Sequence, residues 1–346
     1  MKSKIKVSIV GGSGYTGIEL LRLLISHPNV VIDQITSRND SGKLVSAIYP
    51  SLRGTLSNVF IDPAEANLKE SELVFFATPN GIAMNYVQEL LENGVKVIDL
   101  AADFRIKNVS IWEKWYGMKH QAAEELKKAV YGLPEVNRAA IKEAQLVANP
   151  GCYPTAIQLA LAPLIKSNLI NTETIIADAK SGISGAGKKT ETQLLMSEAS
   201  ENFRAYGLTG HRHLPEIEEN LQAITGQKKI KLTFVPHLLP MVRGIHATLY
   251  VDCIQDFDPL IIFNECYKDE LFIDILEPGS CPETKSVRGS NICRLSFYKI
   301  PDSNRLIILS VIDNLVKGAA GQAIQNMNIM MDWPENTGLD LLALHP

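Results

Sequence analysis

Apolar residues form short continuous runs along the first half of the chain, and most are followed by a polar turn and then a segment of helical periodicity. The runs are rich in β-branched residues, as is typical of strands buried on both faces of a parallel sheet. They cover residues 5–10, 30–35, 73–77 and 95–100. Helical periodicity follows at 18–25 and at about 82–92. This alternation predicts a doubly wound parallel α/β sheet over residues 1–150.

The pattern changes after Pro150. Segments of β-type composition come closer together, with irregular links between them, at residues 174–179, 229–235, 247–252 and 306–311. They predict a mixed or antiparallel sheet, hence an α+β domain over 151–313 that we expect to be the catalytic and dimerisation domain. Residues 314–346 open with a helix rich in Gly and Ala. We expect this C-terminal helix to pack back against the N-terminal domain and complete it.

The first predicted strand leads into a glycine motif. Gly12, Gly14 and Gly17 match G-x-G-x-x-G between a strand and a helix. In a dinucleotide-binding turn the first glycine makes the bend, the second lets the backbone approach a pyrophosphate, and the third lets helix and strand pack closely. The context favours a Rossmann-type nucleotide domain over a structural βα turn.

The end of the second predicted strand indicates which dinucleotide binds. A cofactor with a free ribose 2′-hydroxyl usually meets a carboxylate there, whereas a 2′-phosphate needs a hydroxyl and a cation. Ser37 and Arg38 stand at this place, and Asp33 lies inside the strand, too early to reach the ribose. We therefore expect NADP rather than NAD. The alternative for Arg38 is a solvated loop charge.

Composition narrows the class of protein. The chain has 346 residues, 46 % of them hydrophobic and 21 % charged, and a formal net charge of −4. This balance argues against a nucleic-acid-binding surface, and no apolar run is long enough for a membrane span. The chain starts directly with a strand pattern. Its five cysteines, without a C-x-x-C, do not suggest a disulfide framework or a metal site, so we expect a cytoplasmic protein.

Cys152 follows a Pro-Gly turn and precedes a segment of helical periodicity, residues 155–165. A helix N-terminus favours an anion and lowers the pKa of a thiol placed there, which makes Cys152 a candidate nucleophile. The alternative is a small buried cysteine that packs at a turn.

A second cluster of chargeable groups lies at His211, His213 and Glu216, just before and within an amphipathic helix that we expect to begin near Pro215. Two histidines suit an acid/base role beside a thiolate, with Glu216 orienting one imidazole. Metal binding would need further ligands, which the scattered cysteines do not supply. An exposed polar loop is the remaining alternative.

Arg105 stands at the end of a predicted strand, where open α/β sheets bind ligands. It is a candidate clamp for an anion, or else a member of a surface ion pair. Ser181 and Gly182 begin a Gly/Ser loop that could approach phosphate through backbone N–H groups, but its spacing is not that of a kinase or ATPase loop.

These motifs resemble, in content and order, the N-acetyl-gamma-glutamyl-phosphate reductase family of arginine biosynthesis. The most specific elements are Asn149-Pro150-Gly151-Cys152-Tyr153-Pro154-Thr155 and Gly210-His211-Arg212-His213. Other matches, spread over nearly the whole chain, are residues 11–17, 103–105, 181–187, 240–244 and 314–318.

The resemblance implies that NADPH reduces an acyl phosphate to a semialdehyde through a thioester on Cys152. His213 or His211 would serve as acid and base; His213 is favoured because it lies nearer Glu216. The substrate's phosphate or carboxylate would bind Arg105, with Arg243 and Asn149 as further candidates. The expected cofactor contacts are Gly12, Ser13, Gly14, Tyr15, Thr16, Gly17, Ser37, Arg38, Ser181, Gly182 and Asn314.

Other functions remain compatible with these motifs. The substrate could be the one-carbon-longer aminoadipyl analogue, or the same group on a carrier protein, as in lysine biosynthesis. Aspartate-semialdehyde dehydrogenase runs the same chemistry on aspartyl phosphate, and a non-catalytic NADP(H) sensor would use the same nucleotide domain. In each case we expect a small-molecule ligand and a homodimer or homotetramer, with no nucleic-acid or membrane partner.

Overall fold

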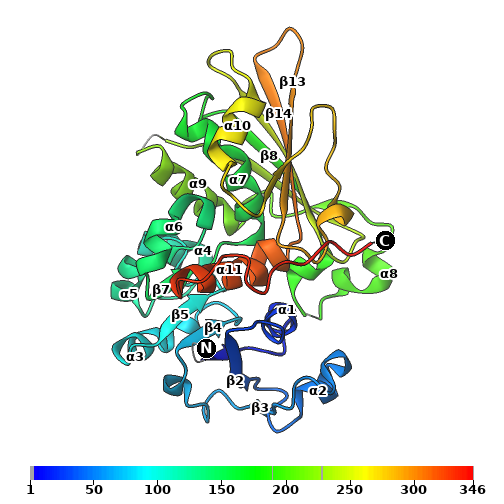
Figure 1. Ribbon diagram of the computed structural model, residues 1–346. Helices are drawn as coiled ribbons and strands as arrows, with labels where there is room; N and C mark the ends of the chain where they lie inside the picture. Colours follow the sequence, from blue (N-terminus) through cyan, green and yellow to red (C-terminus); the bar gives the residue numbers. More distant parts are fainter. Residues whose placement is uncertain (1–3, 189, 227–228, 346) are drawn as a thin grey trace. The chain divides into compact units, whose positions relative to one another are not determined.

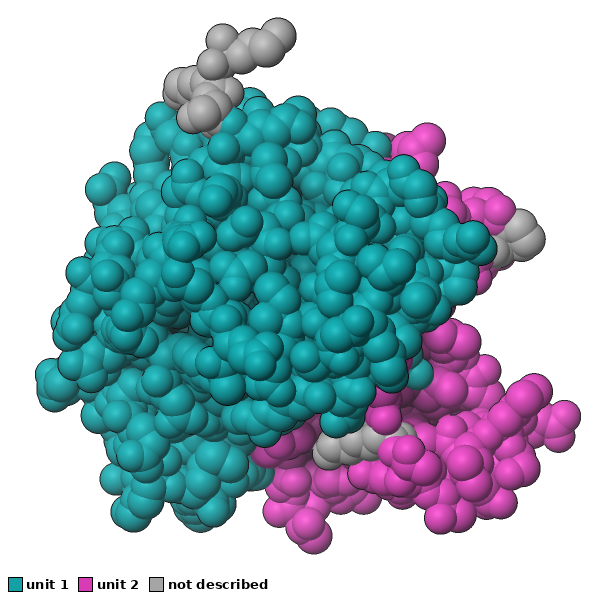
Figure 2. All heavy atoms as spheres, turned by 90° about the horizontal axis from the view of Figure 1, so that it is seen from below, with its two compact units in different colours: residues 1–150, 319–340 teal, residues 151–318, 341–346 magenta. Residues whose placement is uncertain are grey.

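The computed structural model describes residues 4–188, 190–226 and 229–345. The chain divides into two compact units (Figure 2). Unit 1 comprises residues 1–150 and 319–340, and unit 2 comprises residues 151–318 and 341–346. The outermost residues of our predicted terminal segments, 1–3 and 346, lie outside the described residues. Among the residues that are described, no helix is both long enough and apolar enough to cross a membrane.

Unit 1 contains a seven-stranded sheet, and all of its strand pairs are parallel. Its strand order is β3-β2-β1-β4-β5-β7-β6 (Figure 1). The strands are β1 (Ile5–Val10), β2 (Val30–Thr36), β3 (Phe60–Ile61), β4 (Leu73–Phe76), β5 (Lys96–Asp99), β6 (Val130–Tyr131) and β7 (Leu146–Ala148). The order reverses on either side of β1, as in a doubly wound sheet. The predicted α/β class is thereby confirmed.

The strands of unit 1 are buried by helices that lie between them in the chain. All four residues of β4 are buried, because a central parallel strand is covered on both faces. Trp112 and Phe104 belong to the buried core on one side of the sheet, as we expect of an aromatic cluster. The helices of this part are α1 (Tyr15–Leu24), α2 (Val45–Ile48), α3 (Val87–Glu92), α4 (Val109–Tyr116), α5 (Ala123–Lys128) and α6 (Pro134–Glu143).

Unit 2 contains a mixed seven-stranded sheet of order β12-β13-β14-β11-β8-β10-β9. The β8–β10 and β12–β13 pairs are parallel and the others are antiparallel. The strands are β8 (Ile175–Gly182), β9 (Arg204–Ala205), β10 (Leu232–Leu239), β11 (Ile245–Asp252), β12 (Ile273–Ile275), β13 (Cys293–Lys299) and β14 (Arg305–Ile312). The predicted mixed-sheet domain is confirmed, although β9 and β12 were not predicted.

One face of the mixed sheet is covered by helices. Burial alternates strictly along β11, so every second side chain faces this covered side. The helices of unit 2 are α7 (Cys152–Lys166), α8 (Met196–Ala199), α9 (His213–Ile224) and α10 (Pro259–Tyr267). Helix α7 packs against β11, β14 and α9, and thirteen of its residues are buried. The other face of the sheet carries half-buried residues.

The C-terminal segment differs from the single helix that we predicted. A π-helical turn, η7 (Val316–Ala320), precedes α11 (Gly321–Met330), and residues 314–318 and 341–346 belong to unit 2 rather than unit 1. Helix α11 joins unit 1 because Asn326 donates hydrogen bonds to Gly132 and Asn149. The tail joins unit 2 because the Leu344 N–H donates to the carbonyl of Arg288.

Candidate active site

The glycine-rich turn of unit 1 leaves its backbone accessible. Gly11 has a φ of +89°, and a Cβ there would lie 2.5 Å from the Ala77 carbonyl, so Gly11 makes the bend that we had assigned to Gly12. A Cβ on Gly17 would lie 2.5 Å from the Gly11 carbonyl, which explains the close helix–strand packing. At Gly14, the N-cap of α1, the nearest such atom is 3.8 Å away. The Gly14 backbone can therefore approach a phosphate at the helix N-terminus.

Two serines connect this turn to the end of β2. The hydroxyls of Ser13 and Ser37 lie 2.8 Å apart, and the Tyr49 phenol donates to the Ser13 carbonyl at 2.6 Å. Arg38 is exposed beside Ser37. A hydroxyl and a cation thus stand where a ribose 2′-phosphate would bind. Tyr49 was missed because it lies thirty-six residues from Ser13, and no local pattern connects the two.

Arg105 is held by backbone carbonyls of unit 1. The residue is only 8 % exposed, and it donates to the carbonyls of Asn149 and Leu100, both at 2.7 Å. Burial raises the pKa of Asp99, and the nearby Asp103 carboxylate raises it further. Asp103 accepts backbone N–H groups from Gly81 and Met84. The two carbonyl contacts of Arg105 give its guanidinium a fixed orientation.

The Asn149 side chain is engaged within unit 1. It is fully buried, donates to the Ala319 carbonyl and accepts a hydrogen bond from Asn326. These contacts anchor the start of α11 to the end of β7. The substrate contact of Asn149 stays a prediction, and in the structure its amide is hydrogen-bonded within its own unit.

Cys152 is the first residue of α7, as predicted, and it is half-buried. Gly151 is the N-cap, and its N–H donates at 2.8 Å to the carboxylate of Glu216, which is fully buried. The sequence suggested that Glu216 orients a histidine. In the structure its carboxylate holds the turn that carries Cys152, and the contact with a histidine stays a prediction.

The backbone of Gly318 packs against Cys152. A Cβ on Gly318 would lie 2.8 Å from the Cβ of Cys152, closer than atoms of this kind approach. Only glycine fits here without movement. Sequence alone could not reveal this contact, because the two residues are far apart in the chain.

His211 is enclosed by aromatic rings. Its ring centroid lies 4.9 to 5.8 Å from those of Tyr153, Tyr206, His213 and Phe234. Burial, with a smaller contribution from Arg212, lowers the pKa of His211 to about 4. Its Nδ1 accepts the backbone N–H of His213 at 3.1 Å, so the neutral ring carries its proton on Nε2.

His213 begins α9, two residues earlier than we expected for that helix. Its ring contacts Tyr153 edge to face with centroids 6.0 Å apart, and Tyr153 directly follows Cys152. The Tyr153 phenol donates to the His237 carbonyl and accepts from the Tyr206 phenol. Burial raises the pKa of Tyr206 to about 12, so this phenol keeps its proton near neutral pH.

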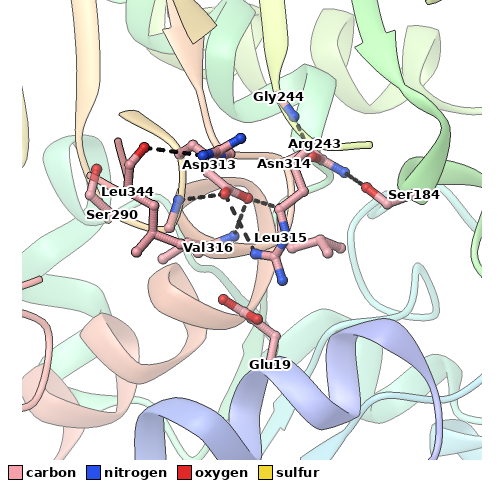
Figure 3. A network of polar contacts seen from close by, with 12 residues as sticks. Glu19, Ser184, Arg243, Gly244, Ser290, Asp313, Asn314, Leu315, Val316 and Leu344 are labelled. Carbon is pink, nitrogen blue, oxygen red and sulfur yellow. Dashed lines mark hydrogen bonds and ion pairs between the residues drawn. The ribbon is translucent and has the colours of Figure 1, made fainter. Parts of the chain in front are cut away.

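Asn314 joins two loops of unit 2 (Figure 3). Its oxygen accepts the Gly244 N–H at 2.7 Å and its nitrogen donates to the Ser184 hydroxyl at 3.0 Å. The two loops also pair through the backbone, where Gly182 donates to the carbonyl of Gly244. Ser181, Gly182, Arg243 and Asn314 are thereby collected in one place, at the end of β8.

The predicted residues fall in both units. The cofactor set from Gly12 to Arg38, together with Arg105 and Asn149, lies in unit 1. Cys152, the histidines, Glu216, Arg243 and the Ser181, Gly182 and Asn314 set lie in unit 2. Across the described part of the chain, no group of three or more His, Cys, Asp or Glu side chains is arranged to hold a metal ion.

Two family descriptions match this chain. The NAD binding domain of semialdehyde dehydrogenases matches residues 6–144, and the semialdehyde dehydrogenase dimerisation domain matches residues 152–314. Solved structures share the fold. Aspartate semialdehyde dehydrogenase II from Vibrio cholerae, complexed with ASA, has a TM-score of 0.74 and 18 % identity over 96 % of this chain and 99 % of its own. Aspartate semialdehyde dehydrogenase with NADP from Candida albicans has a TM-score of 0.71 and 15 % identity over 95 % of this chain and 99 % of its own.

Curated relatives are far more similar in sequence. The N-acetyl-gamma-glutamyl-phosphate reductase of Laribacter hongkongensis is 58 % identical, and that of Nitrosospira multiformis is 55 % identical. Each alignment covers 99 % of this chain and the whole of the relative. The chain belongs to the N-acetyl-gamma-glutamyl-phosphate reductase family.

Proposed function

We propose that this protein reduces N-acetyl-gamma-glutamyl phosphate to N-acetylglutamate 5-semialdehyde with NADPH, using Cys152 as the nucleophile. The observation that carries the proposal is the half-buried Cys152 at the first position of a fifteen-residue helix, with its turn held by the buried Glu216. A helix N-terminus stabilises the thiolate and the oxyanion that forms beside it.

The residues of unit 1 fit NADP(H). The open backbone at Gly14 suits a pyrophosphate, and Ser37 with the exposed Arg38 suits a 2′-phosphate. Ser13, Tyr15, Thr16 and the flanking Gly12 and Gly17 would complete the cofactor contacts, and Ser181, Gly182 and Asn314 would serve the nicotinamide half. When bound, NADPH supplies the hydride for the reduction.

Cys152 divides the reduction into two easier steps. Its thiolate attacks the acyl phosphate carbonyl, a C–S bond forms, and the C–O bond to phosphate breaks with its electron pair leaving on phosphate. The resulting thioester accepts a hydride more readily than a carboxylate does. The C–S bond of the thiohemiacetal then breaks, which releases the semialdehyde and regenerates the thiolate.

His213 is our candidate for the proton transfers. It would protonate the oxyanion formed on hydride addition and remove that proton again as the thiohemiacetal collapses. His211 is a poor acid at neutral pH because burial keeps its ring neutral. Its role would be to hold the His213 backbone through Nδ1.

Arg105 and Arg243 are the candidates for binding the two anionic groups of the substrate. Arg105 is oriented by two carbonyls, and the Arg243 backbone lies next to Gly182 at the end of β8. Because the Asn149 side chain is hydrogen-bonded to Ala319 and Asn326, we propose that it anchors α11 rather than contacting the substrate.

The protein also carries a surface suited to self-association. The uncovered face of the mixed sheet presents half-buried residues from its central strands: Ile176, His246, Thr248, Tyr250, Ile307 and Leu309. This unit is the part matched by the dimerisation domain. We infer a homodimer or homotetramer that pairs through this face. The five free cysteines fit the reducing cytoplasm.

The substrate is tested by kcat/KM in the reverse direction, with NADP, phosphate and each of three semialdehydes. N-acetylglutamate 5-semialdehyde should exceed the aminoadipyl analogue by at least about tenfold, because one methylene is worth roughly that much in a fitted pocket. The margin over aspartate semialdehyde should be larger. Equal or greater activity with either competitor would overturn the assignment.

A further inference from the structure

Asp313 is a buried carboxylate for which the proposed mechanism has no use. It is fully buried in unit 2, immediately after β14. One carboxylate oxygen accepts the backbone N–H groups of Leu315 at 2.8 Å and Val316 at 3.2 Å. The other accepts the Gly289 N–H at 2.7 Å and lies 3.5 Å from Nη1 of Arg243 (Figure 3).

The first oxygen fixes the segment that leads to the nucleophile. Leu315 and Val316 open the turn from Asp313 to Gly318, and the Gly318 N–H donates to the Asp313 carbonyl at 2.9 Å. Gly318 in turn packs directly against Cys152. A short, hydrogen-bonded stretch of backbone therefore connects Asp313 to the Cα and Cβ of Cys152.

The second oxygen faces a loop and a side chain from elsewhere in the unit. Gly289 belongs to the loop whose Arg288 carbonyl accepts the Leu344 N–H, so the C-terminal tail braces this loop. The Arg243 side chain is 26 % exposed, and the residues on either side of it pair with the end of β8 and the turn that follows, residues 182–184. A guanidinium that is partly exposed and held by a buried carboxylate can bind an anion with little loss of side-chain freedom.

We propose that Asp313 is a positioning residue that fixes Arg243 relative to Cys152. Arg243 can then bind an anionic group of the substrate while the substrate's carbonyl lies at the Cys152 sulfur. The inference rests on the proposed function. Asp313 itself does not contact the substrate; it contacts Arg243 and the turn that packs against Cys152.

The test is the steady-state kinetics of Asp313→Asn in the phosphate-dependent reduction of NADP. Asparagine keeps the shape and one acceptor oxygen but loses the charge. We expect the KM for phosphate or for N-acetylglutamate 5-semialdehyde to rise at least about tenfold, with kcat within about threefold of wild type. Which KM rises identifies the group that Arg243 binds.

Two further variants separate positioning from general damage. Arg243→Lys should raise the same KM, and adding Asp313→Asn to it should change that KM by less than about twofold, because the two residues act through one contact. The matched control is Asp274→Asn, which removes the partner of Arg294 in another Asp–Arg pair of this unit, at 2.7 Å, and should leave both KM values unchanged.

Three results would overturn the inference: unchanged KM values in Asp313→Asn, a fall in kcat as large as the rise in KM, or effects of the two variants that multiply. If Asp313→Asn does not fold, Arg243→Ala decides, because it keeps the carboxylate. Added guanidinium ion should then lower the raised KM of Arg243→Ala at least about fivefold. An unchanged KM would count against anion binding by Arg243. A wild type without activity would defeat the proposed function, and this inference with it.

Discussion

His211 and His213 are two residues apart but have different surroundings. His211 lies among four aromatic rings with its Nδ1 occupied by a backbone N–H, and burial lowers its pKa to about 4. His213 is the first residue of α9. The sequence favours His213 only because it lies nearer Glu216, since a pattern of residue types does not reveal which ring is enclosed.

This difference predicts the pH dependence of the two variants. A group with a pKa near 4 is neutral throughout about pH 5.5 to 8, so His211→Gln should leave the shape of the kcat–pH profile in that range unchanged. His213→Gln should lower kcat about 100-fold or more across the same range. Stopped-flow or steady-state rates in a buffer series of constant ionic strength test both. A profile that changes shape only in His211→Gln would reverse the assignment.

Some single residues could be identified from sequence and others could not. Cys152 follows a Pro-Gly turn before a helical pattern, and that local signal was sufficient to place it at a helix N-terminus. The bend at Gly11, the Tyr49 bond to the glycine-rich turn and the contact of Glu216 with Gly151 depend on tertiary packing. The role proposed for Asp313 depends on four donors spread over more than seventy residues.

At the scale of elements, the position of Cys152, the proposed nucleophile, depends on two neighbours that are remote in sequence. Helix α7 sets the position of Cys152, Glu216 on α9 holds its N-cap, and the turn around Gly318 packs against it. Two different segments thus fix the start of one helix. A change in either should alter the geometry at the sulfur before it alters the fold.

Gly318→Ala tests this arrangement. The added methyl group would meet Cys152 at 2.8 Å, so either the turn or the cysteine must shift. We expect kcat to fall at least about tenfold, because a displacement of about 1 Å at a reacting group can cost about 100-fold. Ala223→Ser, which adds one heavy atom at an exposed position of α9, serves as the control for handling and expression. A wild-type kcat in Gly318→Ala would show that the contact between Gly318 and Cys152 does not affect catalysis.

The elements themselves were largely predictable where the signal is local. Continuous apolar runs located the central strands of unit 1, and alternating burial accounts for β11. The C-terminal helix starts later than we predicted, because residues 316–320 form a π-helical turn shaped by Asp313; beyond α11 the chain continues as a tail bound to Arg288. Such long-range hydrogen bonds leave no periodicity in the sequence.

For the whole molecule, composition and pattern suggested two units and a C-terminal helix that packs back against the first, but not the tail that belongs to the second. Residues 319–340 belong with the first half of the chain, while residues 341–346 belong with the second. The uncovered sheet face of unit 2 is the other large-scale feature. Its half-buried strand residues led us to infer self-association.

The oligomer is tested by light scattering of the purified protein. We expect a mass of about two or four times the 38.1 kDa chain. Thr248→Arg places a charge in the middle of the uncovered face and should shift the mass towards one chain, because burying an unpaired charge is costly. Thr55→Arg, at an exposed site in unit 1, should leave the mass unchanged. A wild-type mass of one chain would contradict the inferred assembly.

The central claim, covalent catalysis by Cys152, is tested most directly by the phosphate-dependent reduction of NADP. The purified protein is supplied with N-acetylglutamate 5-semialdehyde and phosphate, with wild type, Cys152→Ser and Cys281→Ser compared in parallel. Cys281 is an exposed cysteine and serves as the matched control. We predict activity in wild type and in Cys281→Ser, and a loss of at least about 1000-fold in Cys152→Ser with the melting temperature retained. Activity of folded Cys152→Ser within about tenfold of wild type would contradict the covalent mechanism.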